Sequence, residues 1–131
     1  MKLTGTPVLL FAYKRPIHLE KTINALQANT LAARTPLVIY IDGPRSQSDA
    51  ALVDEVSNIA SAVSGFASVD IIRRKNNQGL AKSIISGVTD QFASHDQVIV
   101  LEDDLVTTPY FLEYMTSALA HYRSDAAVFS I

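Results

Sequence analysis

Three consecutive carboxylates, Glu102, Asp103 and Asp104, directly follow an apolar run in the segment VIVLEDDL. Like charges on neighbouring residues repel one another, so water or a cation must offset the cost of placing them together. Mg²⁺ and Mn²⁺ are held in proteins by one or two carboxylates together with phosphate oxygens. The triplet is therefore a candidate metal site. The alternative is a solvated strand end in which Asp103 or Asp104 caps nearby backbone N–H groups.

Polar side chains that suit a phosphorylated ligand follow three other apolar runs. They are Tyr13, Lys14 and Arg15 after the first run, Asp42 after the second, and Arg73, Arg74, Lys75, Asn76, Asn77 and Gly79 after the third. Basic side chains and free backbone N–H groups at helix starts bind phosphate, and a divalent ion would bridge such a phosphate to the carboxylates. Any single basic residue here is equally well explained as a solvated surface charge, and Asp42 before Gly43-Pro44 also suits an Asx-turn.

The elements that must position these residues alternate along the chain. Apolar runs predict strands over 6–13, 35–41, 68–74 and 96–104, with a fifth over 126–131. Amphipathic spacing predicts helices over 15–29, 49–66, 79–95 and 108–123, with Ser48 or Asp49 capping the second. Such alternation indicates an α/β fold, a Rossmann-like open, mostly parallel sheet with helices on both faces. Ligands bind beyond the carboxyl ends of such strands, so the polar loops are expected to meet there.

Composition limits the classes of protein to which the chain can belong. Its 131 residues, 48% hydrophobic and 18% charged, suit one globular domain. A net charge of −2 argues against binding to nucleic acid or to an anionic membrane. The absence of cysteine excludes disulfides, zinc–thiolate sites and thiol catalysis. There is no apolar run of the roughly 20 residues that span a bilayer and no signal-peptide pattern, so we predict no membrane span and a cytoplasmic location.

Several nucleotide-binding patterns are missing. No G-x-G-x-x-G follows the first predicted strand and no G-x-x-x-x-G-K-[ST] occurs, which argues against dinucleotide-binding and P-loop proteins. A nucleotidyltransferase usually has a glycine-rich loop with a basic residue after the first strand, and AYKRP has no glycine. A signalling receiver domain would have acidic residues where AYK and RRK end the first and third strands.

Four segments in this order, VLLFAYKRP, VIYIDGP, NNQGLAKSIISG and VIVLEDDL, resemble the N-terminal half of a GT-A fold glycosyltransferase. The LEDD and AYxRP variants are similar to family-two-like enzymes and to the N-acetylglucosaminyltransferase I group. The resemblance covers essentially the whole chain. It implies a metal-dependent enzyme that takes a nucleotide-diphosphate sugar, most often a UDP-sugar, and transfers the sugar to a saccharide or another hydroxyl acceptor.

The resemblance also implies roles for the matching residues. Those expected to contact the nucleotide sugar are Tyr13, Arg15, Asp42, Asn77, Gly79, Lys82 and Asp103. Among them, Asp42 would hydrogen-bond the base, usually uracil, and Asp103 would approach the ribose or the donor sugar. Asp104 would bind Mn²⁺ or Mg²⁺ directly, with Glu102 as a supporting ligand.

Enzymes of this kind normally continue into an acceptor-binding half that supplies the catalytic base. The resemblance therefore implies that residues 1–131 are a single donor-binding domain, truncated before that half, with the base beyond Ile131. Such a domain is expected to bind nucleotide but to transfer sugar poorly, and to self-associate through the apolar surface it would expose. A catalytically incomplete nucleotide-binding or assembly module, or a nucleotidyltransferase, is the alternative function.

Overall fold

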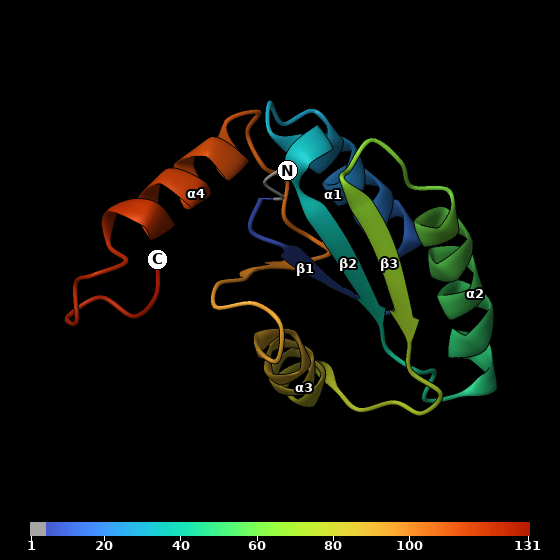
Figure 1. Ribbon diagram of the computed structural model, residues 1–131. Coiled ribbons are helices and arrows are strands. Elements are labelled where there is room, and N and C mark those ends of the chain that lie inside the picture. Colours follow the sequence, from blue (N-terminus) through green and yellow to red (C-terminus); the bar gives the residue numbers. More distant parts are fainter. Residues whose placement is uncertain (1–4) are drawn as a thin grey trace.

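The computed structural model describes residues 5–131 (Figure 1). Strands and helices alternate along this part of the chain, as the sequence predicts. The strands are β1 (Val8–Ala12), β2 (Pro36–Ile41), β3 (Ser68–Arg73) and β4 (Ile99–Glu102). The helices are α1 (Pro16–Gln27), the 3-10 helix η1 (Ala32–Arg34), α2 (Gln47–Ser61), α3 (Leu80–Phe92) and α4 (Phe111–His121).

All four strands are parallel, in the order β3-β2-β1-β4. The chain moves outward from β1 to β2 and β3, and then crosses back to place β4 on the other side of β1. In this register Val8 of β1 pairs with both Leu37 of β2 and Ile99 of β4. The strand order therefore reverses between β1 and β4, and such a reversal is where ligands bind in open α/β sheets. The predicted α/β class is confirmed.

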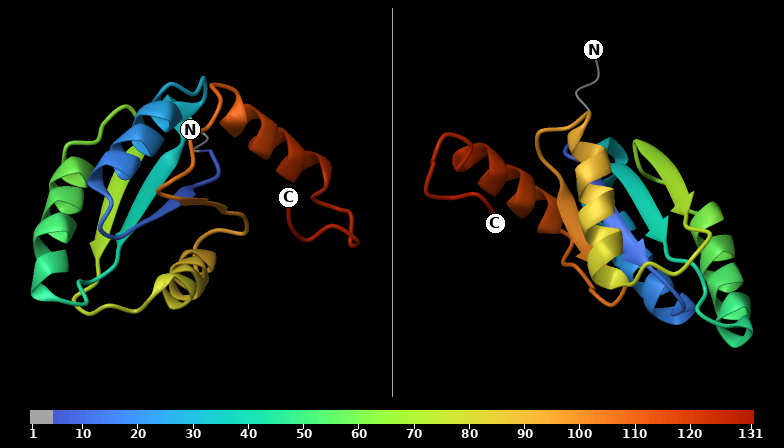
Figure 2. Two further views of the ribbon diagram at one scale, coloured as in Figure 1. Left: turned by 180° about the vertical axis from the view of Figure 1, so that it is seen from behind. Right: turned by 90° about the horizontal axis from the view of Figure 1, so that it is seen from below.

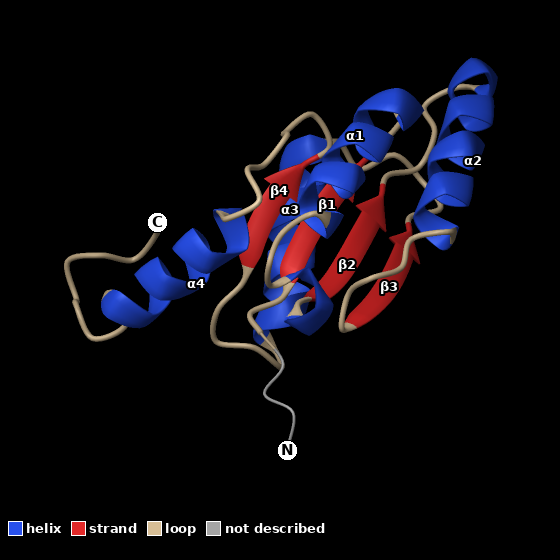
Figure 3. Cartoon of the chain, turned by 90° about the horizontal axis from the view of Figure 1, so that it is seen from above, coloured by secondary structure: helices blue, strands red, loops and turns tan. Residues whose placement is uncertain are grey.

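Helices cover both faces of the sheet. Figures 2 and 3 show α3 on the face opposite to α1 and α2. Because side chains alternate along a strand, Leu10 and Ile39 pack under α1 and α2, whereas Phe11 and Tyr40 face α3. The Phe11 and Tyr40 rings stack with their centroids 5.0 Å apart. The core is larger on the face that two helices cover.

A glycine lets α3 lie close to this aromatic pair. A Cβ atom on Gly87 would lie 2.9 Å from two ring carbons of Phe11 and 3.2 Å from Cζ of Tyr40. The Tyr40 hydroxyl also donates a hydrogen bond to the Gly87 carbonyl, at 3.3 Å. Any larger residue at position 87 must therefore displace either the ring or the helix.

The start of helix α4 is hydrogen-bonded to the residues that follow α1. The side-chain oxygen of Asn29 accepts a hydrogen bond from the Leu112 N–H at 2.9 Å, and its amide donates to the Thr107 hydroxyl at 3.1 Å. Leu112 is fully buried, whereas Met115 and Leu119, further along α4, are only partly buried against the same core. Figures 1 and 3 show α4 at the edge of the molecule. None of the helices in residues 5–131 has the length and apolarity needed to cross a membrane.

Two predicted features were wrong. Helix α2 begins earlier than predicted: Ser46 is its N-cap and accepts a hydrogen bond from the Asp49 N–H at 3.3 Å, so Ser48 and Asp49 already lie in the first turn. Residues 126–131 form no strand, because no neighbouring strand pairs with them in the described part of the chain. Phe129 in this run is fully exposed. An apolar run becomes a strand only where a partner edge accepts its backbone hydrogen bonds.

Candidate functional site

A pocket of about 320 Å³ lies at the carboxyl ends of the strands, beside the start of α3. All four strands run toward this end of the sheet (Figure 3). The residues expected at a nucleotide-sugar site that line the pocket are Tyr13, Arg15, Asp42, Asn77, Gly79 and Asp103. They come from the ends of β1, β2 and β4 and from the loop after β3. The topology therefore brings together residues that are far apart in the sequence.

Arg15 holds the acidic residues that follow β4. Its guanidinium forms an ion pair with Asp103 and lies 3.6 Å from a carboxylate oxygen of Asp104. Asp103 is buried, whereas Asp104 is exposed. The hydrogen bond with Asp103 raises the pKa of Arg15 further above its ordinary value. An arginine is thus the cation that offsets the repulsion within the triplet.

The three carboxylates do not converge. Glu102 is in register with Phe11, which faces α3, so its side chain lies on the α3 side of the sheet. Successive residues of a strand point to opposite faces, which separates Glu102 from the residue that follows it. Asp103 instead meets Arg15. Within residues 5–131, no three acidic or histidine side chains come together as a metal site. Asp104 and Glu102 can supply oxygen ligands, but an ion here would need further oxygens from a bound molecule or from water.

Asp42 connects the end of β2 to the loop after β3. One carboxylate oxygen accepts hydrogen bonds from the backbone N–H groups of Gly43 and Gln78, both at 2.8 Å. The other accepts from the Gly79 N–H at 3.0 Å and from the side-chain amide of Asn77 at 3.2 Å. Asp42 is 7% exposed, so these donors replace the water that a buried carboxylate loses.

Tyr13 connects the pocket to the start of α2. Its hydroxyl donates to Asp49 at 2.8 Å and accepts from the Arg45 N–H at 3.1 Å. The hydrogen bond from Tyr13, together with one from Lys14, holds the pKa of Asp49 below its ordinary value. Burial and the same hydrogen bond to Asp49 raise the pKa of Tyr13. Arg45 also donates from Nε to the side-chain oxygen of Asn77, at 3.1 Å. The rim of the pocket is therefore a connected polar network.

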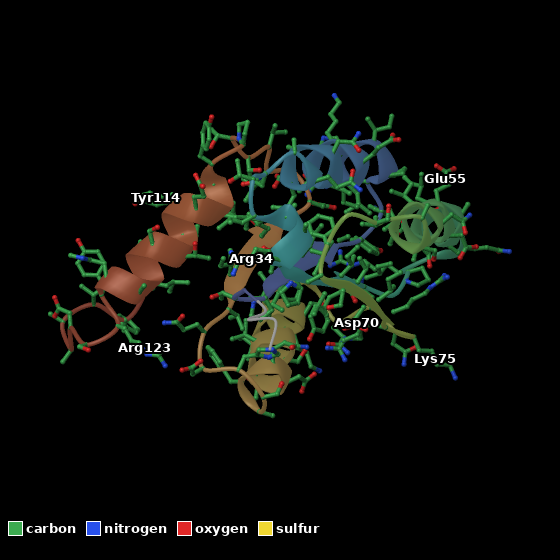
Figure 4. The ribbon with its side chains drawn as sticks, turned by 45° about the horizontal axis from the view of Figure 1, so that its top comes forward. Arg34, Glu55, Asp70, Lys75, Tyr114 and Arg123 are labelled. Atoms are coloured by element: carbon green, nitrogen blue, oxygen red, sulfur yellow. The ribbon has the colours of Figure 1, made fainter. Side chains whose placement is uncertain are left out.

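Several basic residues lie outside the pocket. Lys82 is exposed on α3 and does not line it. Lys75 is also exposed and points outward beyond the end of β3 (Figure 4). Arg73 and Arg74 form ion pairs with carboxylates of α2 and α3. None of the three basic residues at positions 73–75 therefore contributes a side chain to the pocket lining.

The structure adds residues that the sequence reasoning did not select. Arg45, Leu80 and Ser83 line the pocket. Ser83 is 5% exposed, and its hydroxyl has no hydrogen-bond partner among residues 5–131. The sequence did carry a signal for Ser83. It lies four residues after Gly79 on the predicted helix, and residues i and i+4 lie on one face of a helix.

A second pocket, of about 620 Å³, lies between α4, the end of α3 and β4. Its lining combines apolar side chains, among them Leu119 and Phe129, with polar ones such as Asp96 and Arg123. None of the residues expected to bind a nucleotide sugar lies there, so it is distinct from the pocket at the strand ends.

The family model described as Glycosyl transferase family 2 matches residues 8–131. The matched region begins at the first residue of β1 and includes every strand end that contributes to the pocket at the carboxyl edge. No curated protein matches the chain significantly.

Proposed function

The chain belongs to glycosyl transferase family 2, and from this premise we propose that it binds a nucleotide-diphosphate sugar as the donor for sugar transfer. The observation that supports this is the pocket at the reversal of strand order, where expected residues from four separate segments line one cavity. Its volume of about 320 Å³ falls in the range of small-molecule sites.

We propose that the base and ribose occupy the pocket beside Tyr13, Asn77 and Gly79, with Asp103 next to the ribose or the donor sugar. Lys82 lies outside the lining, in the first turn of α3, and its long side chain would border the diphosphate from the rim. A UDP-sugar is the proposed donor. We further propose a donor specificity like that of N-acetylglucosaminyltransferase I, which titrations with a panel of UDP-sugars test.

A divalent ion is part of the proposal, and the residues present are compatible with one. Asp104 is exposed and meets Arg15 only at 3.6 Å, and Glu102 is partly accessible, so both can offer oxygens to Mn²⁺ or Mg²⁺. Such ions commonly use one or two carboxylates and complete their coordination with phosphate oxygens and water. When bound, the ion would neutralise the charge of the departing diphosphate.

The chain's own residues would prepare the donor. Arg15 holds Asp103 in place at the reversal point, and Tyr13 and Arg45 fix the opposite rim. We propose that an acceptor-binding half supplies the base that deprotonates the acceptor hydroxyl, so residues 1–131 alone would bind the donor but transfer its sugar slowly. Self-association and a cytoplasmic location stay predictions from the sequence.

One observation favours a second candidate, a nucleotide-binding module without metal-dependent transfer. Arg15 already neutralises Asp103, and no three acidic side chains converge in residues 5–131. The two candidates agree on nucleotide binding and differ in their dependence on metal. They can therefore be separated by one set of titrations.

Isothermal titration calorimetry with UDP, UDP-sugars and GDP-sugars, each with and without Mn²⁺, tests the proposal. We expect UDP binding that Mn²⁺ strengthens and that Asp104→Ala makes independent of Mn²⁺. Asp125→Ala is the control, because this exposed residue lies outside the pocket lining. Binding that ignores Mn²⁺ would favour the metal-independent module. Absence of binding to every nucleotide would contradict the donor-site proposal.

A further inference from the structure

We infer that Asp42 acts as a positioning residue: it holds the loop of residues 76–79, and it does not read the base directly. This inference rests on the proposed function in so far as the pocket takes a nucleotide. The inference goes beyond the proposed function by assigning Asp42 a role different from the base contact that the family resemblance implies.

The first observation is that the Asp42 carboxylate has no acceptor capacity left. A carboxylate offers about four lone-pair sites, two on each oxygen. In the folded chain Gly43 and Gln78 occupy one oxygen, and Gly79 and Asn77 occupy the other, at distances of 2.8–3.2 Å. A base N–H could bind only by displacing one of these donors. Such a displacement would break a hydrogen bond to a buried, charged acceptor that is already formed in the folded chain.

The second observation is independent of the carboxylate. The loop packs so closely on the end of β2 that a Cβ atom on Gly43 would lie 2.4 Å from the carbonyl carbon of Asn76. The side-chain amide of Asn77 also donates to the Gly43 carbonyl at 2.8 Å. Asp42 and Gly43 therefore hold the loop in place through close backbone packing as well as through hydrogen bonds.

The held loop carries part of the pocket wall. Asn77 and Gly79 line the pocket, and the Asn77 side-chain oxygen accepts a hydrogen bond from Arg45. Gly79 has φ +79°, a conformation that fixes the path of the chain into α3. Holding the loop before a ligand arrives reduces the ordering that binding must otherwise cost. Asp42 would thus raise affinity for every nucleotide that uses this wall.

The first test is amide hydrogen exchange, which needs no ligand. We expect the Gln78 and Gly79 amides to be protected in the wild-type chain. We expect Asp42→Asn to increase their exchange by about tenfold or more, since hydrogen bonds to a charged acceptor are strong. Asp54→Asn, a change at an exposed carboxylate on α2, is the control and should leave both amides unchanged. Unprotected amides in the wild-type chain would overturn the inference.

The second test compares UDP with CDP, because uracil N3 carries a hydrogen and cytosine N3 does not. If Asp42 positions the loop, Asp42→Asn weakens both nucleotides by the same factor. Gly43→Ala, which displaces the loop but keeps the carboxylate, should also leave the UDP-to-CDP ratio unchanged and provides a second variant. A shift of this ratio toward CDP in Asp42→Asn, with the loop amides still protected, would overturn the inference.

The two tests also separate this inference from the proposed function. If the wild-type chain binds neither nucleotide, the donor-site proposal fails. The exchange of the Gln78 and Gly79 amides would still show whether Asp42 holds the loop.

Discussion

Arg15 and Asp103 form an ion pair that joins the N-cap of α1 to the residue after β4, although the two lie 88 positions apart in the sequence. The pair lies where the strand order reverses, and both residues line the pocket. The buried carboxylate is anchored further by its own backbone, because the Asp103 carbonyl accepts a hydrogen bond from Thr22 at 2.8 Å. One ion pair therefore connects the stability of the domain to the shape of its site.

Replacing Arg15 with alanine should lower the free energy of unfolding by about 1–3 kcal/mol, because Asp103 would then be a buried charge without its partner. Urea denaturation measures the loss. Adding Asp103→Asn to Arg15→Ala should recover part of it, since a neutral amide costs less to bury than a carboxylate. An Arg15→Ala chain as stable as the wild type would show that water reaches Asp103.

Replacing Ser83 with alanine should leave the free energy of unfolding unchanged or raise it by up to about 1 kcal/mol. The reason is that the change removes a buried hydroxyl without a partner and introduces a better helix former. Ser61→Ala is the comparison, because the Ser61 hydroxyl donates to the Ser57 carbonyl at 2.8 Å. A clear loss of stability in Ser83→Ala would mean that an ordered water satisfies this hydroxyl.

Replacing Gly87 with alanine should lower the free energy of unfolding by about 1–3 kcal/mol, because the new methyl group would overlap the Phe11 ring. The better helix propensity of alanine, worth about 1 kcal/mol, would offset only part of this loss. Thr89→Ala, at an exposed position of the same helix, should be close to neutral. Equal thermal midpoints for the two variants would show that α3 can move outward without cost.

The contribution of Asp49 to stability should depend on pH. Its pKa is lower in the folded chain than its ordinary value, so its stabilising effect is fully present above about pH 4 and is lost as the pH falls through the folded pKa. Urea midpoints of wild type and Asp49→Asn should therefore differ most near neutral pH and converge as the pH falls below the folded pKa of Asp49. Tyr13→Phe removes the main hydrogen bond to Asp49 and should weaken this pH dependence. A constant difference between the two chains would contradict the assignment.

Much of the fold follows from local patterns. Four apolar runs of strand length, separated by amphipathic segments, predict the strands, the helices and the parallel sheet. The boundaries were less accurate: the start of α2 depends on which of several neighbouring polar residues caps it, and Ser46 does so. Residues 126–131 have a strand-like composition, but pairing depends on a neighbouring edge, which local composition does not specify.

The site was predictable as a set of loops but not as a set of contacts. The rule on strand ends correctly placed Tyr13, Asn77 and Gly79 at one pocket. The partners of the acids could not be read from sequence, because they depend on side-chain directions across the sheet. Strand alternation separates Glu102 from its neighbour, and only the packed structure pairs Asp103 with Arg15.

The position of β4 beside β1 has a consequence for how the domain folds. Among the described strands, β1 is made before the others and pairs with β4, which is made after them, so the order of the chain delays closure of the sheet. Contacts of such high sequence separation slow folding, because a long loop must be ordered before they form. During synthesis β1 can pair with β2 early, whereas the Val8–Ile99 register must wait until β4 has been made. The pocket, whose lining includes Asp103 just after β4, therefore cannot be completed before β4 is made, and a nascent chain exposes the β1 edge until then.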